Sequence, residues 1–302
     1  MGRIKFRDAK LSKANIYRLE QINGIIQEYQ AGGYTMTLRQ LYYQLVSRDV
    51  IPNSDKEYSK LSNVLKEGRM AGIVDWGAIE DRLRVPYTPA SFDSPQDIVN
   101  AAINQYKTDK QEGQPIYTEV WVEKDALSGV LKRVTSKYHV PIMVNRGYSS
   151  VTAMYDAFMR FVNEGAYKNR GVNILYLGDF DPSGLDMIRD ISTRLREFQE
   201  GYNDGDLVAN MHVYVESIAL TKEQIDLYNP PPNPAKITDP RAAGFIKRHG
   251  HTSWEVDALK PEVLNDLLTE AIEDKMNMGV YEQMIEKEEE DKKKLNTLKN
   301  AL

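Results

Sequence analysis

The sequence predicts an α/β protein with two parts, a helical N-terminal domain followed by a domain built on a mostly parallel sheet. From residue 116 onward, short runs rich in Val and Ile alternate with amphipathic segments. That alternation is typical of parallel strands covered by helices on both faces. Residues 85–115 contain two polar, Pro-containing stretches around one helix. We therefore place the domain boundary near residue 110, which gives domains of 1–110 and 111–302.

Composition narrows the class of protein. A chain of 302 residues is long enough for two domains of ordinary size. The absence of cysteine excludes disulfides, zinc thiolate sites and cysteine nucleophiles. No apolar run approaches the roughly 18 residues that span a bilayer. A secretory signal has an apolar segment after its charged start, and the charged start of this sequence is not followed by one. We expect a cytoplasmic protein with no membrane partner.

Charge is unevenly distributed along the chain. Residues 1–70 hold 12 Lys and Arg against 7 Asp and Glu, so the remaining residues carry a net charge of −10 within the overall −5. A basic front and an acidic back fit a DNA-gripping module joined to a metal-binding one. Chance unevenness on solvated surfaces is the alternative.

Three helices are predicted in the N-terminal domain, over residues 13–31, 37–49 and 54–72. Thr37 with Gln40, and Ser54 with Glu57, have the spacing of capping boxes. With the "IVDWGAIEDRLRV" stretch after them, the helices predict a helix-turn-helix core with a wing or arm. The third helix would then enter a DNA groove, and its lysines would contact phosphates; these are Lys56, Lys60 and Lys66.

Four strands are predicted in the second domain, within "YTEVWVEK", "VPIMVNRG", "VNILYLGDFD" and "NMHVYVESIAL". The "NPPPNPAKITDP" stretch is expected to be an extended loop, and the tail "EKEEEDKKKLNTLKN" a solvated or frayed helix. The sequence contains neither a GxxxxGK[ST] phosphate loop nor a GxGxxG fingerprint. Nucleotide binding through these loops is therefore not predicted.

Acidic residues end two of the predicted strands: Glu123 follows the first, and Asp179 and Asp181 follow the third. Ligands of open parallel sheets bind at the carboxyl ends of the strands. Carboxylates at i and i+2 point the same way on extended backbone, and a Mg²⁺ or Mn²⁺ ion would offset their repulsion. The alternative is that Asp181 only caps a helix that starts at Pro182, with Gly184 permitting close packing.

The motifs "VEKDA" at 122–126 and "DFDPSG" at 179–184 resemble those of the Toprim domain. The resemblance is greatest to the A subunit of type IIB topoisomerases (topoisomerase VI) and the related meiotic double-strand-break transesterase. That family also has a winged-helix domain with a nucleophilic tyrosine in an Arg-x-x-Tyr-Tyr pattern, which "RQLYY" at 39–43 matches. The resemblance implies that Glu123, Asp179 and Asp181 bind Mg²⁺.

Two adjacent tyrosines in "RQLYY" require a choice. Leu38, Leu41 and Leu45 mark the buried face of the predicted helix, and Tyr42 joins that face through its i+4 spacing to Leu38. Tyr43 lies about 200° round from Leu41 and is expected to point away from the core, one turn from Arg39. The helical geometry therefore selects Tyr43.

The resemblance implies a reaction and partners. Tyr43 would attack a phosphodiester of double-stranded DNA, leaving a phosphotyrosine bond and a free 3′ hydroxyl, with Arg39 and the metal favouring the transition state. In the family the tyrosine of one subunit works with the Mg²⁺ of the other, so a homodimer is implied. Topoisomerase VI has its GHKL-type ATPase in a separate B subunit. This chain contains no ATPase domain, so the resemblance leaves two alternatives: a partnership with such a B subunit, or a compact stand-alone relative that works without one.

Other readings stay open. Water could be the nucleophile at the Toprim metal site, which would make the chain a nuclease in which Tyr43 only binds DNA. Asp179 could be the nucleophile of a phosphohydrolase, or the chain could be a DNA-binding regulator whose sheet domain only dimerises. Lys124 is expected to contact DNA. Glu255 and Asp257 in "SWEVDAL" either support the metal shell or form a polar cap.

Overall fold

The computed structural model describes residues 2–80, 89–145, 147–202, 206–235 and 238–299. Its centre is a sheet of four strands in the order β2–β1–β3–β4, and every neighbouring pair runs parallel. The strands are β1 (Ile116–Val122), β2 (Ile142–Val144), β3 (Gly171–Leu177) and β4 (Val213–Ala219). The α/β class and the four predicted strands are thereby confirmed.

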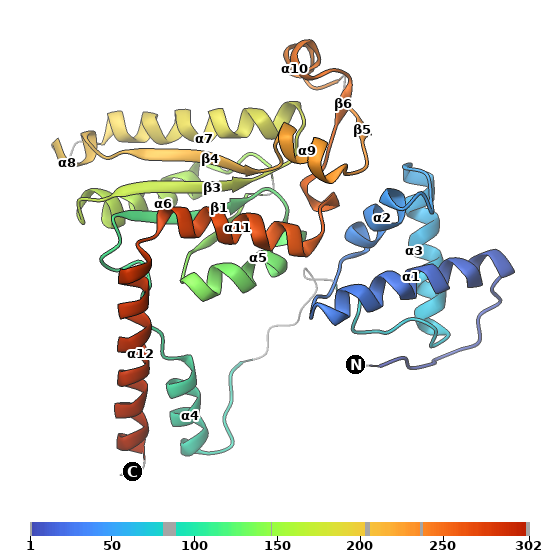
Figure 1. Cartoon of the computed structure of the whole chain (residues 1–302), viewed down its shortest axis with the longest axis horizontal. Helices are drawn as coiled ribbons and strands as arrows, with labels where there is room; N and C mark the ends of the chain where they lie inside the picture. The colour runs from blue at the N-terminus through green and yellow to red at the C-terminus, as the bar shows by residue number, and fades with distance from the viewer. Residues whose placement is uncertain (1, 81–88, 146, 203–205, 236–237, 300–302) are drawn as a thin grey trace.

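Helices cover both faces of this sheet (Figure 1). On one face, Val120 and Val122 pack against α5 (Asp125–Tyr138) and α11 (Pro261–Lys275). On the other, Trp121 packs against α6 (Val151–Phe161) and α7 (Pro182–Gly201). Apolar residues on both sides of a strand explain why β1 and β3 read as continuous apolar runs rather than as alternating ones. A π-helical turn, η1 (Val162–Ala166), continues α6.

The N-terminal domain is formed by α1 (Lys13–Ala31), α2 (Leu38–Ser47) and α3 (Asp55–Met70), which enclose their own apolar cluster. The Thr37–Gln40 capping box at the start of α2 is confirmed. The box predicted for α3 is only half formed. The Ser54 hydroxyl accepts the Glu57 amide, but the Glu57 carboxylate pairs with Lys60 instead of reaching back.

The expected wing is described only in part. Residues 73–80 form turns and one isolated bridge between Ile79 and Met36, and they contain no hairpin. The rest of the expected wing, from residue 81, lies outside the described residues. The described part of this segment, residues 73–80, therefore does not form the wing of a winged-helix domain.

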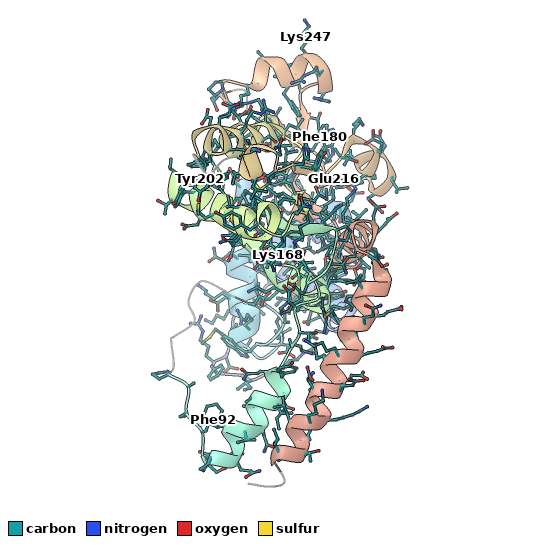
Figure 2. All side chains as sticks on the ribbon, turned by 90° about the vertical axis from the view of Figure 1, so that its left-hand side faces the viewer. Phe92, Lys168, Phe180, Tyr202, Glu216 and Lys247 are labelled. Carbon is teal, nitrogen blue, oxygen red and sulfur yellow. The ribbon has the colours of Figure 1, made fainter. Side chains whose placement is uncertain are left out.

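Small elements surround the carboxyl ends of the strands. They are α9 (Lys222–Tyr228), β5 (Asn233–Pro234), α10 (Ala242–His249), β6 (Thr252–Ser253) and the short 3₁₀ helix η2 (Val256–Ala258). The short helix α8 (Asp206–Ala209) lies at the opposite end of the sheet, before the start of β4 (Figure 1). The predicted extended loop therefore contains β5, which pairs antiparallel with β6. Figure 2 shows Lys247 pointing outward from α10 at one end of the molecule.

Two helices distant in sequence, α4 (Pro95–Gln105) and α12 (Met278–Lys299), lie side by side below the sheet (Figure 1). We expected the tail of the chain to be a solvated or frayed helix. It is helical, but α12 packs against α4 on one side. Its Glu288 is buried, bonds the Thr108 amide, and pairs with the buried Lys110 and with Lys107. The segment that leads into β1 is thus fixed to the last helix.

We expect Glu288→Gln to lower the free energy of unfolding by about 3 kcal/mol or more, because it leaves Lys110 buried without its carboxylate. Burial alone would raise the pKa of Glu288, but hydrogen bonds from Lys110, Lys292 and Lys107 hold that pKa below its usual range. A depressed pKa contributes stability that is present above the unfolded value of about 4.3 and lost as the pH falls through the folded pKa. The difference in free energy of unfolding between wild type and Glu288→Gln should therefore become smaller below about pH 4.

Urea unfolding at several pH values measures that difference. The exposed neighbour Glu289 supplies the control, since Glu289→Gln should change stability by less than about 0.5 kcal/mol. A difference that stays constant down to pH 3 would contradict the ionic origin of the effect.

Among the described residues, no helix is long and apolar enough to cross a membrane.

Candidate functional site

The first aspartate after β3 lies at the centre of a buried ionic cluster. Asp179 is 9% exposed, and its Oδ1 accepts the backbone amide of Val256 at 2.9 Å. The same oxygen lies 2.8 Å from Nζ of Lys124, the residue that precedes α5. Burial is the main cause that raises the pKa of Asp179 to about 7. The Lys124 charge lowers this pKa, and the Glu123 charge raises it. This carboxyl group is therefore held at the edge of the sheet by two other segments.

The second aspartate, Asp181, is the N-cap of α7. Its Oδ1 accepts the Gly184 amide at 2.7 Å and the Ser183 hydroxyl at 2.9 Å. Pro182 occupies the first turn of the helix, where its missing amide hydrogen costs nothing. The capping role that was the alternative to metal binding is confirmed, and it fixes the direction of this carboxylate.

Glu123 follows β1 and joins the two aspartates. Its Oε2 accepts the backbone amide of Asp179 at 3.1 Å. Burial raises the pKa of the Tyr176 phenol, and the charges of Glu123, Asp179 and Asp181 raise it further, so all three acids surround the same hydroxyl. The sequence therefore correctly placed these acids at one edge of the sheet.

These acids are gathered, yet they do not converge on one point. In the part of the chain that the structure describes, no three acidic or histidine side chains are arranged to hold a metal ion. The positive charge beside Asp179 is the Lys124 ammonium. Carboxylate oxygens are nevertheless the ligands that a hard divalent cation prefers, and the Glu123, Asp179 and Asp181 set fits such an ion chemically.

Lys124 connects Asp179 to two further acids that lie about 75 residues later in the chain. Its Nζ is 2.8 Å from Glu255 Oε2 and 2.8 Å from Asp257 Oδ1, and only 15% of its side chain is exposed. Burial would lower the pKa of Lys124, but the charges of Asp257, Asp179 and Glu255 raise it above the usual range. Lys124 is an internal counterion here, and its expected contact with DNA stays a prediction.

Arg39 brings the N-terminal domain into the same cluster. From α2, its guanidinium donates to Glu255 Oε2 at 2.5 Å and lies 3.4 Å from Asp257 Oδ2. Asp257 is fully buried, and its Oδ2 has no hydrogen-bond partner among the residues that the structure describes. Burial opposes ionisation of Glu255, yet Lys124 and Arg39 lower the pKa of Glu255 to about 2. Glu255 and Asp257 are thus part of the site, rather than only a polar cap.

The two tyrosines of α2 differ in their surroundings but not in their exposure. Tyr42 packs in the helical cluster as predicted, and its hydroxyl donates to Asn53 and accepts the Ser54 amide. Tyr43 was expected to point away from the core, and this is wrong, because it is also only 5% exposed. The covering segment comes from the other domain, since α2 packs against η2 and Ala258 joins the N-terminal cluster.

Tyr43 and Glu255 line the same cavity, and the Arg39 guanidinium, which donates to Glu255, lies 5.8 Å from the centre of the Tyr43 ring. Burial, and then the negative charge of Glu255, raises the pKa of Tyr43 above its usual range. The raised pKa disfavours the phenolate, which is the reactive form of a tyrosine nucleophile, in this arrangement. The cavity has a volume of about 410 Å³ and is lined in part by Arg39, Tyr43 and Glu255.

The lysines expected to contact phosphates lie on the exposed side of α3. Lys56 is exposed, Lys60 pairs with Glu57 at 2.5 Å, and Lys66 lies 3.7 Å from Glu67 with 63% of its side chain exposed. Surface pairs of this kind are weak and can be exchanged for a phosphate at little cost. Their DNA-binding role stays a prediction.

Gly184 explains the spacing of the "DFDPSG" motif. A Cβ at this position would lie 2.2 Å from the carbonyl oxygen of Asp179, so α7 can start only because residue 184 has no side chain. We expect Gly184→Ala to lower the free energy of unfolding by about 2–3 kcal/mol through overpacking and to displace Asp179. Thermal or urea unfolding measures this change.

The last residue of the same helix is a matched control. A Cβ added at Gly201 would meet no atom within 4 Å, so Gly201→Ala should be neutral or slightly stabilising. Equal stabilities of the two variants would show that the contact at Gly184 relaxes without cost.

No protein-family model and no curated protein matches the chain. The functional conclusion therefore comes from the sequence motifs and from the geometry of this site.

Proposed function

We propose that the chain is a DNA-cleaving transesterase of the topoisomerase VI A-subunit type, with a winged-helix domain that carries Tyr43 and a Toprim domain that carries the acids. One observation supports this most strongly. Arg39 from α2, Lys124 after β1, Asp179 after β3 and the Glu255–Asp257 pair form one continuous ionic cluster. Tyr43 lies beside that cluster, because it lines one cavity together with Arg39 and Glu255. The two motifs on which the resemblance rests thus meet in space.

In this proposal Glu123, Asp179 and Asp181 hold a Mg²⁺ ion, with Mn²⁺ as a substitute. A bound divalent ion polarises the phosphodiester and neutralises charge in the transition state. Tyr43 attacks the phosphorus through its oxygen, so that a phosphotyrosine bond forms and the 3′ oxygen leaves as a hydroxyl. Arg39 stabilises the charge that develops on the phosphate oxygens. Rejoining reverses these bond changes and consumes no cofactor.

The partners follow from the same proposal. Double-stranded DNA lies along α3, and a homodimer brings the tyrosine of one subunit to the metal of the other. A separate GHKL-type ATPase subunit would make the protein a topoisomerase, and cleavage alone does not need one. Burial of Tyr43 against its own chain requires α2 and η2 to separate before attack.

A Toprim nuclease that uses water is the second candidate. The observation that favours it is the burial of Tyr43, which raises the pKa of the phenol rather than lowering it. In that case the cavity beside Tyr43 would bind a DNA strand while a metal-activated water attacks the phosphate.

One experiment distinguishes the candidates. The protein is incubated with supercoiled plasmid and Mg²⁺, the mixture is denatured, and DNA ends are examined for covalently attached protein. An adduct supports the transesterase, whereas cleaved DNA without an adduct supports the nuclease. No effect on DNA, together with phosphatase activity that needs Asp179, would replace both with a phosphohydrolase. DNA binding without any reaction would indicate a regulator.

A further inference from the structure

A second and larger pocket lies beside the cavity at Tyr43. Its volume is about 620 Å³, and its walls come from the start of α2, from α3, from residues 76–80 and from the start of α5. Arg39 and Tyr58 line both this pocket and the cavity at Tyr43. The volume falls within the range of about 300–1,000 Å³ that is usual for sites of small organic ligands.

Arg69 supplies the pocket with a half-buried cation. Its guanidinium stacks over the Trp76 ring at 4.5 Å and donates to the Trp76 carbonyl at 2.9 Å. Its Nε is buried and has no hydrogen-bond partner among the described residues, and none of their carboxylates pairs with Arg69 within 4 Å. Burial lowers the pKa of Arg69. A desolvated guanidinium of this kind favours an anion that completes its hydrogen bonds.

Lys66 lies one turn before Arg69 on the same face of α3 and also lines the pocket. Two carboxylates, Glu80 and Asp125, line it as well. A polyphosphate that filled the pocket would meet these negative charges. A ligand with a single phosphate near Lys66 and Arg69 avoids that repulsion.

The remaining wall suits a planar, largely apolar group. The pocket surface is more apolar than polar, and the aromatic rings of Tyr58 and Trp76 are part of it. Nucleobases bind proteins by stacking on such rings and by contact with apolar side chains, at about 1–3 kcal/mol per base. The other apolar wall residues are Leu38, Leu65, Met70, Ile79 and Ala126.

We propose that this pocket binds one unstacked nucleotide of the DNA strand, with its base on the apolar wall and its phosphate at Lys66 and Arg69. The proposal rests on the proposed function, because the pocket adjoins the cavity where a scissile phosphate would meet Tyr43. Extruding a base from a duplex costs a few kcal/mol, and enzymes that modify bases recover this cost through contacts in a fitted pocket. The extruded nucleotide would fix which phosphate reaches Tyr43.

The test uses thymidine 5′-monophosphate as the probe, titrated into the full chain by calorimetry without Mg²⁺, so that no cleavage occurs. Wild-type protein should bind the nucleotide at least ~10-fold more tightly than thymidine or inorganic phosphate, each of which makes only half of the contacts. Arg69→Met should weaken binding at least ~10-fold. Equal affinity for phosphate alone, or no binding of the nucleotide, overturns the proposal.

Arg69 also bonds backbone carbonyls, so a second variant separates binding from folding. Ser62→Phe places a ring in the pocket without removing any charge, and it should abolish nucleotide binding while thermal unfolding stays near wild type. Lys13→Ala, which removes an exposed positive charge at the start of α1 outside the pocket, should bind as wild type does. Unchanged binding by Ser62→Phe would place the nucleotide elsewhere and contradict the proposal.

The outcomes also separate this proposal from the one on which it rests. Covalent adducts without nucleotide binding would reject the pocket alone. Nucleotide binding without any effect on DNA would reject the transesterase alone.

Discussion

Tyr43→Phe is expected to abolish covalent attachment of the protein to DNA, with a loss of at least ~10³-fold, because the substitution removes the only oxygen proposed to attack the phosphorus. The ring still fills the space between α2 and η2. Only one hydroxyl group is lost, so the free energy of unfolding should fall by about 1 kcal/mol or less. Radiolabelled DNA ends that remain with the protein after denaturation measure the adduct.

Tyr42→Phe is the matched control. It removes a hydroxyl that is equally buried but is bonded to Asn53 and to the Ser54 amide within the N-terminal domain. The unpaired Ser54 amide should cost about 1–3 kcal/mol of stability, while the adduct still forms. An adduct that persists in Tyr43→Phe and disappears in Tyr42→Phe would reverse our assignment.

The second large effect is expected from Lys124→Met. The substitution removes the ammonium that lies between three carboxylates, those of Asp179, Glu255 and Asp257. Leaving buried charges without their partner typically costs about 3–5 kcal/mol, and urea unfolding should show a loss of this size. Lys60→Met, which breaks a surface pair on α3, should cost at most about 1 kcal/mol.

The same variant tests the cation site without measuring activity. If Glu123, Asp179 and Asp181 bind Mg²⁺, the ion should stabilise Lys124→Met by about 2–3 kcal/mol at a hundred times its dissociation constant. Wild-type protein should gain less, because Lys124 competes for Asp179. Equal gains in Lys124→Met, Lys60→Met and wild type would indicate nonspecific ion binding and contradict the assignment of these ligands.

Local patterns predicted much of the fold. The helix over residues 13–31, the Thr37 cap and all four strands were correct, because each depends on side-chain periodicity and on hydrogen bonds within a few residues. The half-formed box at Ser54 shows the limit of such patterns. There, the Tyr42 hydroxyl binds the amide that the Glu57 side chain was expected to reach, and this competitor comes from another helix.

The residues of the candidate site that directly follow a strand could be predicted from the sequence. Those placed by contacts between segments far apart in the chain could not. Asp179 lies at the edge of the sheet because β3 ends there, as the sequence indicated. The exposure of Tyr43 was misjudged, because a helical projection of α2 does not include η2, more than 200 residues later. For the same reason, no pattern in the neighbouring sequence indicated that Arg39 and Lys124 would form ion pairs with Glu255.

The contact between α2 and η2 has a consequence for how the protein is made. As the chain leaves the ribosome, residues 13–70 emerge first and can form their three helices, since domains generally fold as units during synthesis. Ala258, which completes the apolar cluster of that domain, emerges only after residues 71–257 have been synthesised. Until then, the nascent chain presents the uncovered side of α2 to water, so prematurely terminated chains should be bound by chaperones and removed by proteases.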